Sequence, residues 1–287
     1  MLAQTYPHIE VIISDNNSSD NTEEVVSGFS DSRIRYIRQA KNIGANNNWN
    51  FCLEQASGGY FLLLHDDDLI DADHIETCMK SVAYESGIGL IRTGIRWIDS
   101  NGVVAHAKHN PATGLSTEEF FTAWFDGKVP MHLCGTIFNT KYLRAIGGFK
   151  QDFHPFQDVL AEVELAARFG RVDVLDIKAS FRQHDSSQTR AQHLETWCKA
   201  SGRLLEVMCS LVSNYKPIFR KKGLRFFAKH NYKLAREIKS PVARMRAYMV
   251  VFYHFGHFQT WLILVTSRIN AFRDLWHLSK KIKRTIT

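Results

Sequence analysis

Three consecutive aspartates, Asp66, Asp67 and Asp68, follow His65 at the end of an apolar run over residues 60–64. Carboxylates this close together repel one another, and such crowding usually persists because a cation neutralises it. Ligands that are all oxygen favour a hard ion, so the pattern predicts Mg²⁺ or Mn²⁺ bridging the carboxylates to a diphosphate. A solvated acidic turn that caps the next helix is the alternative. The carboxyl end of a buried strand is where α/β sheets bind their ligands, and this position favours the ion.

A second polar segment, with the letters DNNSSDNT, follows the first apolar run of the chain at residues 8–14. Asp15 and Asn16 open this segment, and we expect them at the same sheet edge as the aspartates. There an Asp or Asn side chain can recognise a base or a ribose by hydrogen bonding. Taken alone, the segment is better explained as an ordinary turn rich in Asp and Asn.

Short apolar runs that alternate with helical patterns must position these residues. The first 85 residues predict strands at 8–14, 34–37 and 60–64, and helices that start at residue 23 and cover 49–56 and about 73–84. This alternation predicts an α/β fold with a mainly parallel sheet that helices cover on both faces.

The next hundred residues predict further elements of the same fold. Residues 89–98 and 103–107 read as a hairpin that turns at Asn101-Gly102. The later pattern predicts helices at 117–126 and 158–169, strands at 132–139 and 172–177, and a Gly-Gly turn within 145–149. After about residue 195 the pattern is helical and increasingly basic.

The charge is distributed unevenly between an acidic body and a basic tail. Residues 216–287 carry 17 Lys/Arg and two acidic residues, a net charge of +15, and the rest of the chain has a net charge of −8. Such a tail indicates an anionic partner, either membrane phospholipid or nucleic acid. Its most apolar stretch, residues 248–265, contains two histidines and a glutamine, which argues against a single membrane span. A helix in the membrane interface and a bundle of ordinary helices packed on the body both stay open.

The cysteines and the N-terminal residues indicate the cellular compartment of the protein. The five cysteines form no C-x-x-C pair and are odd in number, which indicates neither a zinc site nor a disulfide framework. A reducing compartment is the simplest interpretation. We see no charged and then apolar leader and expect no signal peptide.

Several motifs occur in one order along the chain. They are LAQTYPHIEVIISDNNSSDNT, NIG with a trailing NWN, GGYFLLLHDDD, GGF at residues 147–149, QD at 157–158, and FRQHDSS ending at 187. In order and spacing they resemble glycosyltransferase family 2, over roughly residues 2–190. The resemblance implies a GT-A fold, with a Rossmann-like mixed sheet and helices on both faces, and an inverting transfer from a nucleoside diphosphate sugar.

The resemblance also implies roles for residues on the nucleotide side. Asp15 and Asn16 match the pair that contacts the base, and Asn42, Gly44 and Asn48 match the loop near the nucleotide. The second residue of that pair is usually an aspartate in the family and is Asn16 here, which leaves the identity of the base open.

The remaining implied roles concern the metal and the reaction. Asp66 and Asp67 match the DxD-type acids, one near the ribose and one on the metal, with Asp68 beside them. His184 matches a histidine close to the diphosphate and completes the expected metal set, and Asp158 matches the catalytic base. Capping of the next helix for Asp158 and a structural role for His184 are the alternatives.

The start of the chain departs from the family. Met1 stands at the last turn of the family's first helix, so the family's first strand, which lies inside the sheet, is expected to be missing. Its loss would leave unpaired backbone groups on both neighbours, at about 1–3 kcal/mol each if buried. We expect a longer natural chain with an earlier start; a truncated, inactive relative is the alternative.

Together these observations predict a GT-A domain at residues 1–192 and a basic helical extension at 193–287. The expected function is metal-dependent sugar transfer to a lipid-linked glycan in cell-surface polysaccharide biosynthesis, in the cytoplasm at the inner face of the plasma membrane. We expect peripheral membrane contact through the basic helices and no nucleic-acid partner. A nucleotidyltransferase and a non-catalytic nucleic-acid-binding protein are the competing functions; the first lacks its Gly- and Arg-rich phosphate loop, and the second leaves the aspartates without a role.

Overall fold

The computed structural model describes residues 1–83, 87–183, 193–212 and 217–256. The strands are β1 (Val11–Asp15), β2 (Ile34–Arg38), β3 (Tyr60–Phe61), β4 (Leu69–Ile70), β5 (Leu90–Ile98), β6 (Val104–Lys108), β7 (Thr136–Asn139) and β8 (Arg171–Arg182). The helices are α1 (Thr22–Ser27), α2 (Ala45–Gln55), α3 (His74–Ser81), α4 (Thr117–Phe125), α5 (Thr140–Ala145), α6 (Gln157–Phe169), α7 (Leu194–Leu211), α8 (Pro217–Arg236) and α9 (Pro241–Phe255).

The larger sheet has the strand order β3-β7-β5-β8-β4, with β6 paired to β5. Among the described residues of this sheet, β5 and β8 alone pair in parallel, and the other ladders are antiparallel. The prediction of a mixed α/β sheet is therefore confirmed, whereas the expectation that it is mainly parallel is wrong. One reason is that β7 runs antiparallel to β3 and β5, between which it lies. A second is that the sequence predicts no strand at β4, which pairs antiparallel with β8. β6 was predicted as the second arm of the hairpin with β5.

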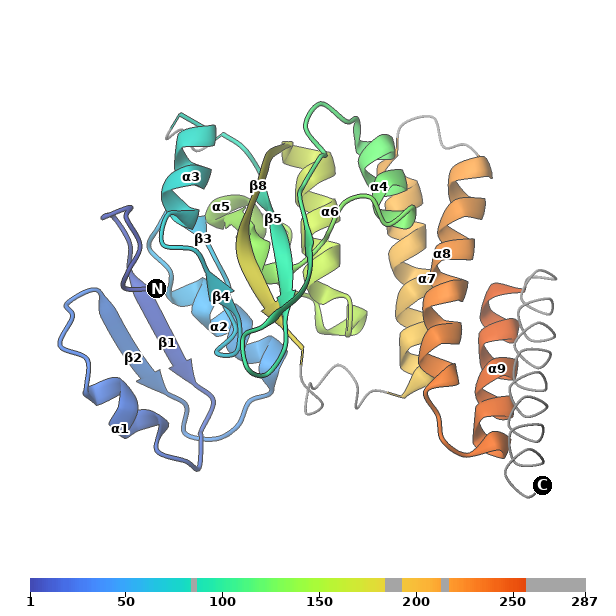
Figure 1. Cartoon of the computed structure of the whole chain (residues 1–287), viewed down its shortest axis with the longest axis horizontal. Helices are drawn as coiled ribbons and strands as arrows, with labels where there is room; N and C mark the ends of the chain where they lie inside the picture. Colours follow the sequence, from blue (N-terminus) through green and yellow to red (C-terminus); the bar gives the residue numbers. More distant parts are fainter. Residues whose placement is uncertain (84–86, 184–192, 213–216, 257–287) are drawn as a thin grey trace, which may run out of the picture.

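β1 and β2 form a separate parallel pair, with Val11 opposite Ile34 and Asp15 opposite Arg38. Within the described residues, no ladder joins this pair to β3. Figure 1 shows β1, β2 and α1 at one end of the molecule, beside the larger sheet. The family resemblance expects a further strand inside the sheet, and this expectation stays a prediction.

Helices cover both faces of the larger sheet, as predicted. Ile75 and Cys78 of α3 pack with Ile91 of β5 in one buried cluster. Leu160 of α6 belongs with Leu90 to the main core on the opposite face. Neighbouring residues of β5 thus enter different clusters, as the two-residue alternation of a strand requires.

Several predicted boundaries shift. α2 starts at Ala45 rather than at residue 49, and the strand predicted at 60–64 ends at Phe61. Residues 133–135 form a 3₁₀ turn, so β7 begins only at Thr136, and α5 precedes the Gly-Gly turn without having been predicted. The hairpin at the β5–β6 turn is confirmed.

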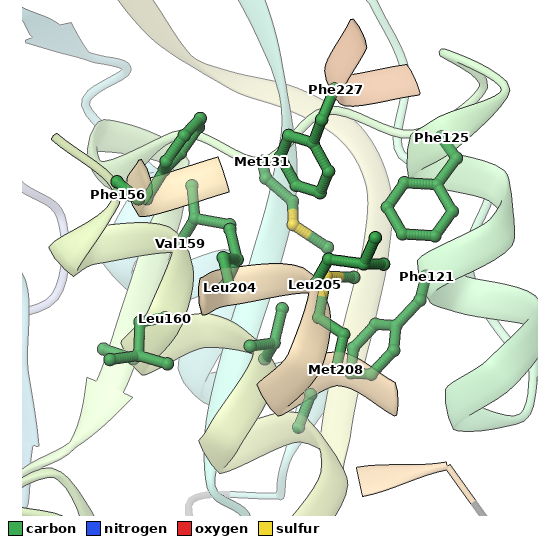
Figure 2. Packing of buried hydrophobic residues seen from close by; sticks show 14 of the residues in the cluster. Phe121, Phe125, Met131, Phe156, Val159, Leu160, Leu204, Leu205, Met208 and Phe227 are labelled. Atoms are coloured by element: carbon green, nitrogen blue, oxygen red, sulfur yellow. The ribbon is translucent and has the colours of Figure 1, made fainter. Parts of the chain in front are cut away.

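One continuous hydrophobic core includes residues of the sheet and of the tail helices α7, α8 and α9. Figure 2 shows Leu204 and Met208 of α7 between Val159 of α6 and Phe121 of α4, with Phe227 of α8 above them. α7 to α9 therefore form a bundle of helices packed on the body, which is one of the two alternatives that the sequence left open. The division at residues 192/193 stays a prediction. Among the described helices, none is both long and apolar enough to cross a membrane.

Candidate active site

The carboxylate of Asp15 ends β1 as a buried hydrogen-bond acceptor, 4% exposed. It accepts from the hydroxyl of Tyr36 at 2.6 Å and from the backbone N–H of Ser18 at 2.7 Å. Burial alone would raise the pKa of Asp15, but these hydrogen bonds outweigh it and lower the pKa. Asp15 is therefore a fixed anion that shapes the turn after β1.

The other residues predicted on the nucleotide side are joined to this turn. Asn16 donates to Asn42 Oδ1 at 3.0 Å and accepts from the backbone N–H of Ile43, while Asn42 Oδ1 also accepts from Gly44 N–H. Gly44 has φ +84° at the start of α2, a conformation that favours glycine. The structure thus brings Asp15, Asn16, Asn42 and Gly44 together.

α2 connects this nucleotide side to the aspartate run. Asn48 accepts from the hydroxyl of Ser14 at 2.6 Å and donates to its carbonyl at 2.9 Å. On the next residue, the Trp49 ring lies 5.2 Å from the ring of His65 and 5.6 Å from that of Phe149. One helix therefore fixes both the end of β1 and the residue that precedes the aspartates.

The same helix holds the GGF turn. Asn50 donates to the carbonyl of Phe149 at 2.8 Å and accepts from its N–H at 2.8 Å, and Asn46 donates to the same carbonyl at 2.9 Å. Gly148 has φ +68°, and a Cβ there would lie 2.3 Å from Asn50 Oδ1. Only glycine fits this close approach. The sequence did not predict these contacts, although the repeated asparagines of NNNWN at helical spacing were a signal.

The aspartate run forms a turn between β3 and β4. His65, Asp67 and Asp68 offer ligand atoms that all lie within 4.8 Å of one another, a geometry that can hold a metal ion. Carboxylate oxygens suit Mg²⁺ and Mn²⁺, so the donor set fits the predicted ions. Asp66 is exposed on the same turn and does not belong to this group.

Asp68 is the buried member of the run, 5% exposed. Its Oδ1 accepts from the backbone N–H of Arg182 at 2.9 Å, and Oδ2 lies 3.9 Å from His65 Nδ1. Burial raises the pKa of Asp68 to about 6, against the lowering effect of the Arg182 N–H and His65. A nearby cation stabilises the ionised form of such a carboxylate and so offsets the effect of burial on its pKa.

Asp158 stands in the first turn of α6, beside the cis His154-Pro155 bond. Burial raises its pKa, opposed by backbone N–H groups of the helix and by the charges of His65 and His154. His65 thus acts electrostatically on both Asp68 and Asp158. The predicted base and two of the predicted metal ligands therefore share one neighbour.

Glu162, one turn further along α6, is fully buried and was not predicted. Its Oε2 accepts from Arg92 Nε at 3.1 Å, and Arg92 itself is 2% exposed. Burial, with a smaller contribution from Asp158, raises the pKa of Glu162 to about 7 against the lowering effect of Arg92. Nothing in the sequence signals this pair, because Arg92 reads as a polar interruption of an apolar strand.

The predicted site residues are thus placed as follows. Asp15, Asn16, Asn42, Gly44 and Asn48 surround the β1–α2 junction. Asp67 and Asp68 lie with His65 in the possible metal group, and the charge of His65 lowers the pKa of Asp158. His184, predicted as the third metal ligand, lies outside the described residues. His65, which the sequence analysis did not assign, is instead the third donor of the group, and its signal was its place directly before the aspartates.

Comparison with known proteins shows which family the chain matches. The model of the family described as Glycosyl transferase family 2 matches residues 1–144. The chain is 34% identical over 104 residues to the UDP-Glc:alpha-D-GlcNAc-diphosphoundecaprenol beta-1,3-glucosyltransferase WfgD of Escherichia coli, covering 36% of this chain and 41% of that protein. The chain thus spans less than half the length of this relative.

Solved structures share the fold. A crystal structure of Staphylococcus aureus TarS residues 1–349 in complex with UDP superposes with a TM-score of 0.59 at 15% identity, over 83% of this chain and 69% of that one. The mannosyltransferase PcManGT of Pyrobaculum calidifontis, in complex with GDP-Man and Mn²⁺, gives 0.54 at 16% identity, over 94% and 74%. These neighbours identify the fold as GT-A.

Proposed function

The chain belongs to glycosyltransferase family 2, and on that premise we propose that it moves a sugar from a nucleoside diphosphate sugar to a hydroxyl group of a glycan. The proposal includes a divalent ion, Mn²⁺ or Mg²⁺, and inversion at the anomeric carbon. The observation that carries it is the position of His65, which belongs to the possible metal group and acts on the pKa of both Asp68 and Asp158.

The donor is held in this proposal by the β1–α2 junction and the aspartate run. Asp15 and Asn16 contact the base, Asn42 and Gly44 approach the nucleotide, and Asp66 approaches the ribose. Asn48 is already bonded to Ser14 through both ends of its amide. Its role is therefore to hold the end of β1 in place, close to the nucleotide.

Asp67, Asp68 and His65 are the residues that would hold the ion. The ion, when bound, neutralises charge that develops on the departing diphosphate. His184 stays a proposed contact to the diphosphate. With the carboxylates committed to the ion, Asp158 is left as the acidic group available to the acceptor.

Asp158 is proposed to accept the proton of the acceptor hydroxyl. The oxygen attacks the anomeric carbon as the bond from that carbon to the diphosphate oxygen breaks, so a single displacement inverts the configuration. A raised pKa makes Asp158 a stronger base than an ordinary aspartate. Glu162, one turn further along α6, is paired with Arg92, and Asp158 contributes to its raised pKa.

The acceptor is proposed to be lipid-linked and the reaction to serve cell-surface polysaccharide assembly. The name of the relative WfgD states a diphosphoundecaprenol acceptor for that protein. The basic helices α8 and α9 would contact the membrane at its inner, cytoplasmic face, without a nucleic-acid partner. No observation favours the nucleotidyltransferase, the nucleic-acid-binding protein or the inactive relative over this function.

Thermal unfolding with UDP, GDP or dTDP, each with and without Mn²⁺, tests the proposal. We expect at least one nucleoside diphosphate to raise Tm only when the ion is present. Asp67→Ala should abolish this ion-dependent rise, whereas Asp176→Asn, an exposed carboxylate on β8, should keep it. A rise that survives Asp67→Ala would exclude the proposed ion site.

Transfer itself tests the base. Asp158→Asn should keep the nucleotide-dependent rise in Tm and slow transfer by about 10²–10⁴-fold, the usual contribution of a general base. The measurement is release of nucleoside diphosphate from the donor that the Tm experiment identifies, with a panel of glycan acceptors. Unchanged transfer by the variant would remove Asp158 from the mechanism.

A further inference from the structure

Four aromatic rings from four segments converge at the ends of β5 and β8. The ring of Trp97 on β5 stacks on that of His106 on β6, with centroids 5.0 Å apart and an interplanar angle of 30°. The His132 ring meets Trp97 edge-on at 5.3 Å and lies 5.0 Å from Phe181 of β8. We call Trp97, His106, His132 and Phe181 the aromatic platform.

The platform adjoins the aspartate run through the β5–β8 ladder. Trp97 is paired with Phe181, and the next residue, Arg182, donates its backbone N–H to Asp68 Oδ1 and its Nε to the carbonyl of Asp67, at 2.9 and 2.8 Å. Trp97 and Phe181 also pack in one cluster with Leu64, the residue before His65. Phe181 of the platform is therefore next in the chain to Arg182, which bonds to the proposed metal ligands Asp67 and Asp68.

The members of the platform differ in exposure. Phe181 and Trp97 are half-buried, and His106 is exposed on β6. Burial, with smaller contributions from Arg92 and Lys108, lowers the pKa of His132 to about 4, so its ring is neutral near pH 7. The platform thus combines an indole, a phenyl ring and imidazoles.

This combination matches the chemistry of a pyranose ring. One face of many pyranoses carries only C–H groups, which pack on aromatic rings, while their rim of hydroxyls needs hydrogen-bond partners. Imidazole nitrogens both donate and accept. Apolar walls with a few polar groups are also the usual composition of small-molecule sites.

The position in the sheet indicates which sugar the platform would receive. The proposed nucleotide contacts come from β1 and α2, and β1 belongs to a sheet separate from that of β5, β6 and β8. Figure 1 shows β1 on one side of β4, the strand that follows the aspartate run, and β8 and β5 on the other. We propose that the aromatic platform, with Trp97 at its centre, is a subsite for a pyranose residue of the acceptor. This inference rests on the proposed function, because the acceptor is defined only by the transfer.

Saturation-transfer NMR with the methyl glycosides of glucose, galactose, GlcNAc and GalNAc, in the presence of UDP and Mg²⁺, tests the subsite on the whole chain. We expect wild-type protein to saturate at least one glycoside. Trp97→Ala should weaken that binding about tenfold, as expected for loss of a stacked ring, and Trp97→Phe should keep it within about threefold. Phe29→Ala, an aromatic residue 56% exposed elsewhere in the chain, should bind like the wild type.

Two further measurements keep the outcomes distinct. The UDP-dependent rise in Tm shows whether each variant is folded and still binds the nucleotide. If the wild-type protein shows no nucleotide-dependent rise, the proposed function is contradicted, but the subsite is not. His106→Ala, on the exposed strand, repeats the test without touching the core and should also weaken glycoside binding. Equal glycoside binding by wild type, Trp97→Ala and His106→Ala, or no binding by the wild type at millimolar glycoside, would overturn the subsite.

Discussion

His65 lies among acidic groups that the proposed reaction would use differently. Its Nδ1 is 3.9 Å from Asp68 Oδ2 on the side of the proposed ion, and its charge lowers the pKa of Asp158 on the side of the acceptor. The ring of Trp49 packs beside it. A histidine in this place therefore acts electrostatically on both sides of the proposed site.

His74 makes the stability of the fold depend on pH. It is fully buried at the start of α3, and burial lowers its pKa from 6.5 to about 4. The unfolded chain therefore binds one proton more between these values, so the stability is complete above about pH 6.5 and falls by about 3 kcal/mol as pH drops toward 4. Urea unfolding at pH 7.5, 5.5 and 4.5 should show a smaller acid loss for His74→Met than for the wild type.

The exposed His8 provides the control for that experiment. His8→Met should lose stability with acid as the wild type does, because His8 is exposed and its replacement leaves the buried imidazole of His74 in place. Equal acid sensitivity of His74→Met and the wild type would show that His74 does not cause the loss.

Individual site residues were predictable where they belong to a run. The aspartates can be read because adjacent carboxylates repel one another and such crowding points to a cation. The Asx-rich turn alone reads as an ordinary turn, and the roles of its residues and of Asp158 came from the family resemblance. Arg92 and Glu162 could not be read, because their pairing joins a strand to a helix 70 residues further along the chain. Long-range pairs of this kind leave no local pattern.

α2 is the element on which the site depends most. It bonds to the end of β1 through Asn48, contacts His65 through Trp49 and holds the GGF turn through Asn46 and Asn50. Residues on successive positions of one helix point in different directions, about 100° apart. This is why one short helix can reach three separate parts of the site.

Asn50→Ala should lower the free energy of unfolding by about 1–3 kcal/mol, because it leaves the N–H and the carbonyl of Phe149 without the Asn50 amide. Asn47→Ala is the matched control: its amide donates only to the Ile43 carbonyl on the exposed side of the helix. We expect it to change the stability by less than about 0.5 kcal/mol. Urea unfolding of both variants gives the comparison, and equal losses would contradict the role of Asn50.

The elements themselves were largely predictable, and their pairing was not. Most helices and strands follow from apolar periodicity and from Gly, Asn and Asp at the turns. The direction of β7 does not, because an apolar strand of four residues has the same pattern whichever way it runs. β4, with two residues, is too short to give a pattern at all.

At the scale of the whole molecule, the tail helices are part of the core on one side and exposed on the other. Ala247, Val251 and Phe255 of α9 are buried against the bundle. The opposite face has an apolar stripe of large residues, 44–86% exposed: Val242, Met245, Met249, Phe252 and Tyr253. Basic side chains, Arg244 and Arg246 among them, lie on the same helix.

Binding to lipid vesicles tests whether this stripe is the proposed membrane contact. Wild-type protein should sediment with phosphatidylglycerol vesicles and much less with phosphatidylcholine, because each basic residue near an anionic surface contributes about 1 kcal/mol. Combining Met249→Asp and Tyr253→Asp should weaken binding to the anionic vesicles about tenfold or more. Val103→Asp, at an apolar residue 62% exposed beside β6, should not. Equal binding by the double variant would assign the contact to another surface or exclude it.

The interrupted sheet has a consequence for the chain in solution. In the part of the chain that the structure describes, β1 forms a ladder on one side only, with β2. On its other side the Asn48 amide covers the Ser14 carbonyl, but no described strand pairs with β1 there. A strand edge without a neighbouring strand is a template for a strand of another molecule. Copies of this chain should therefore self-associate as their concentration rises, and a soluble peptide that pairs with this edge of β1 would keep them apart.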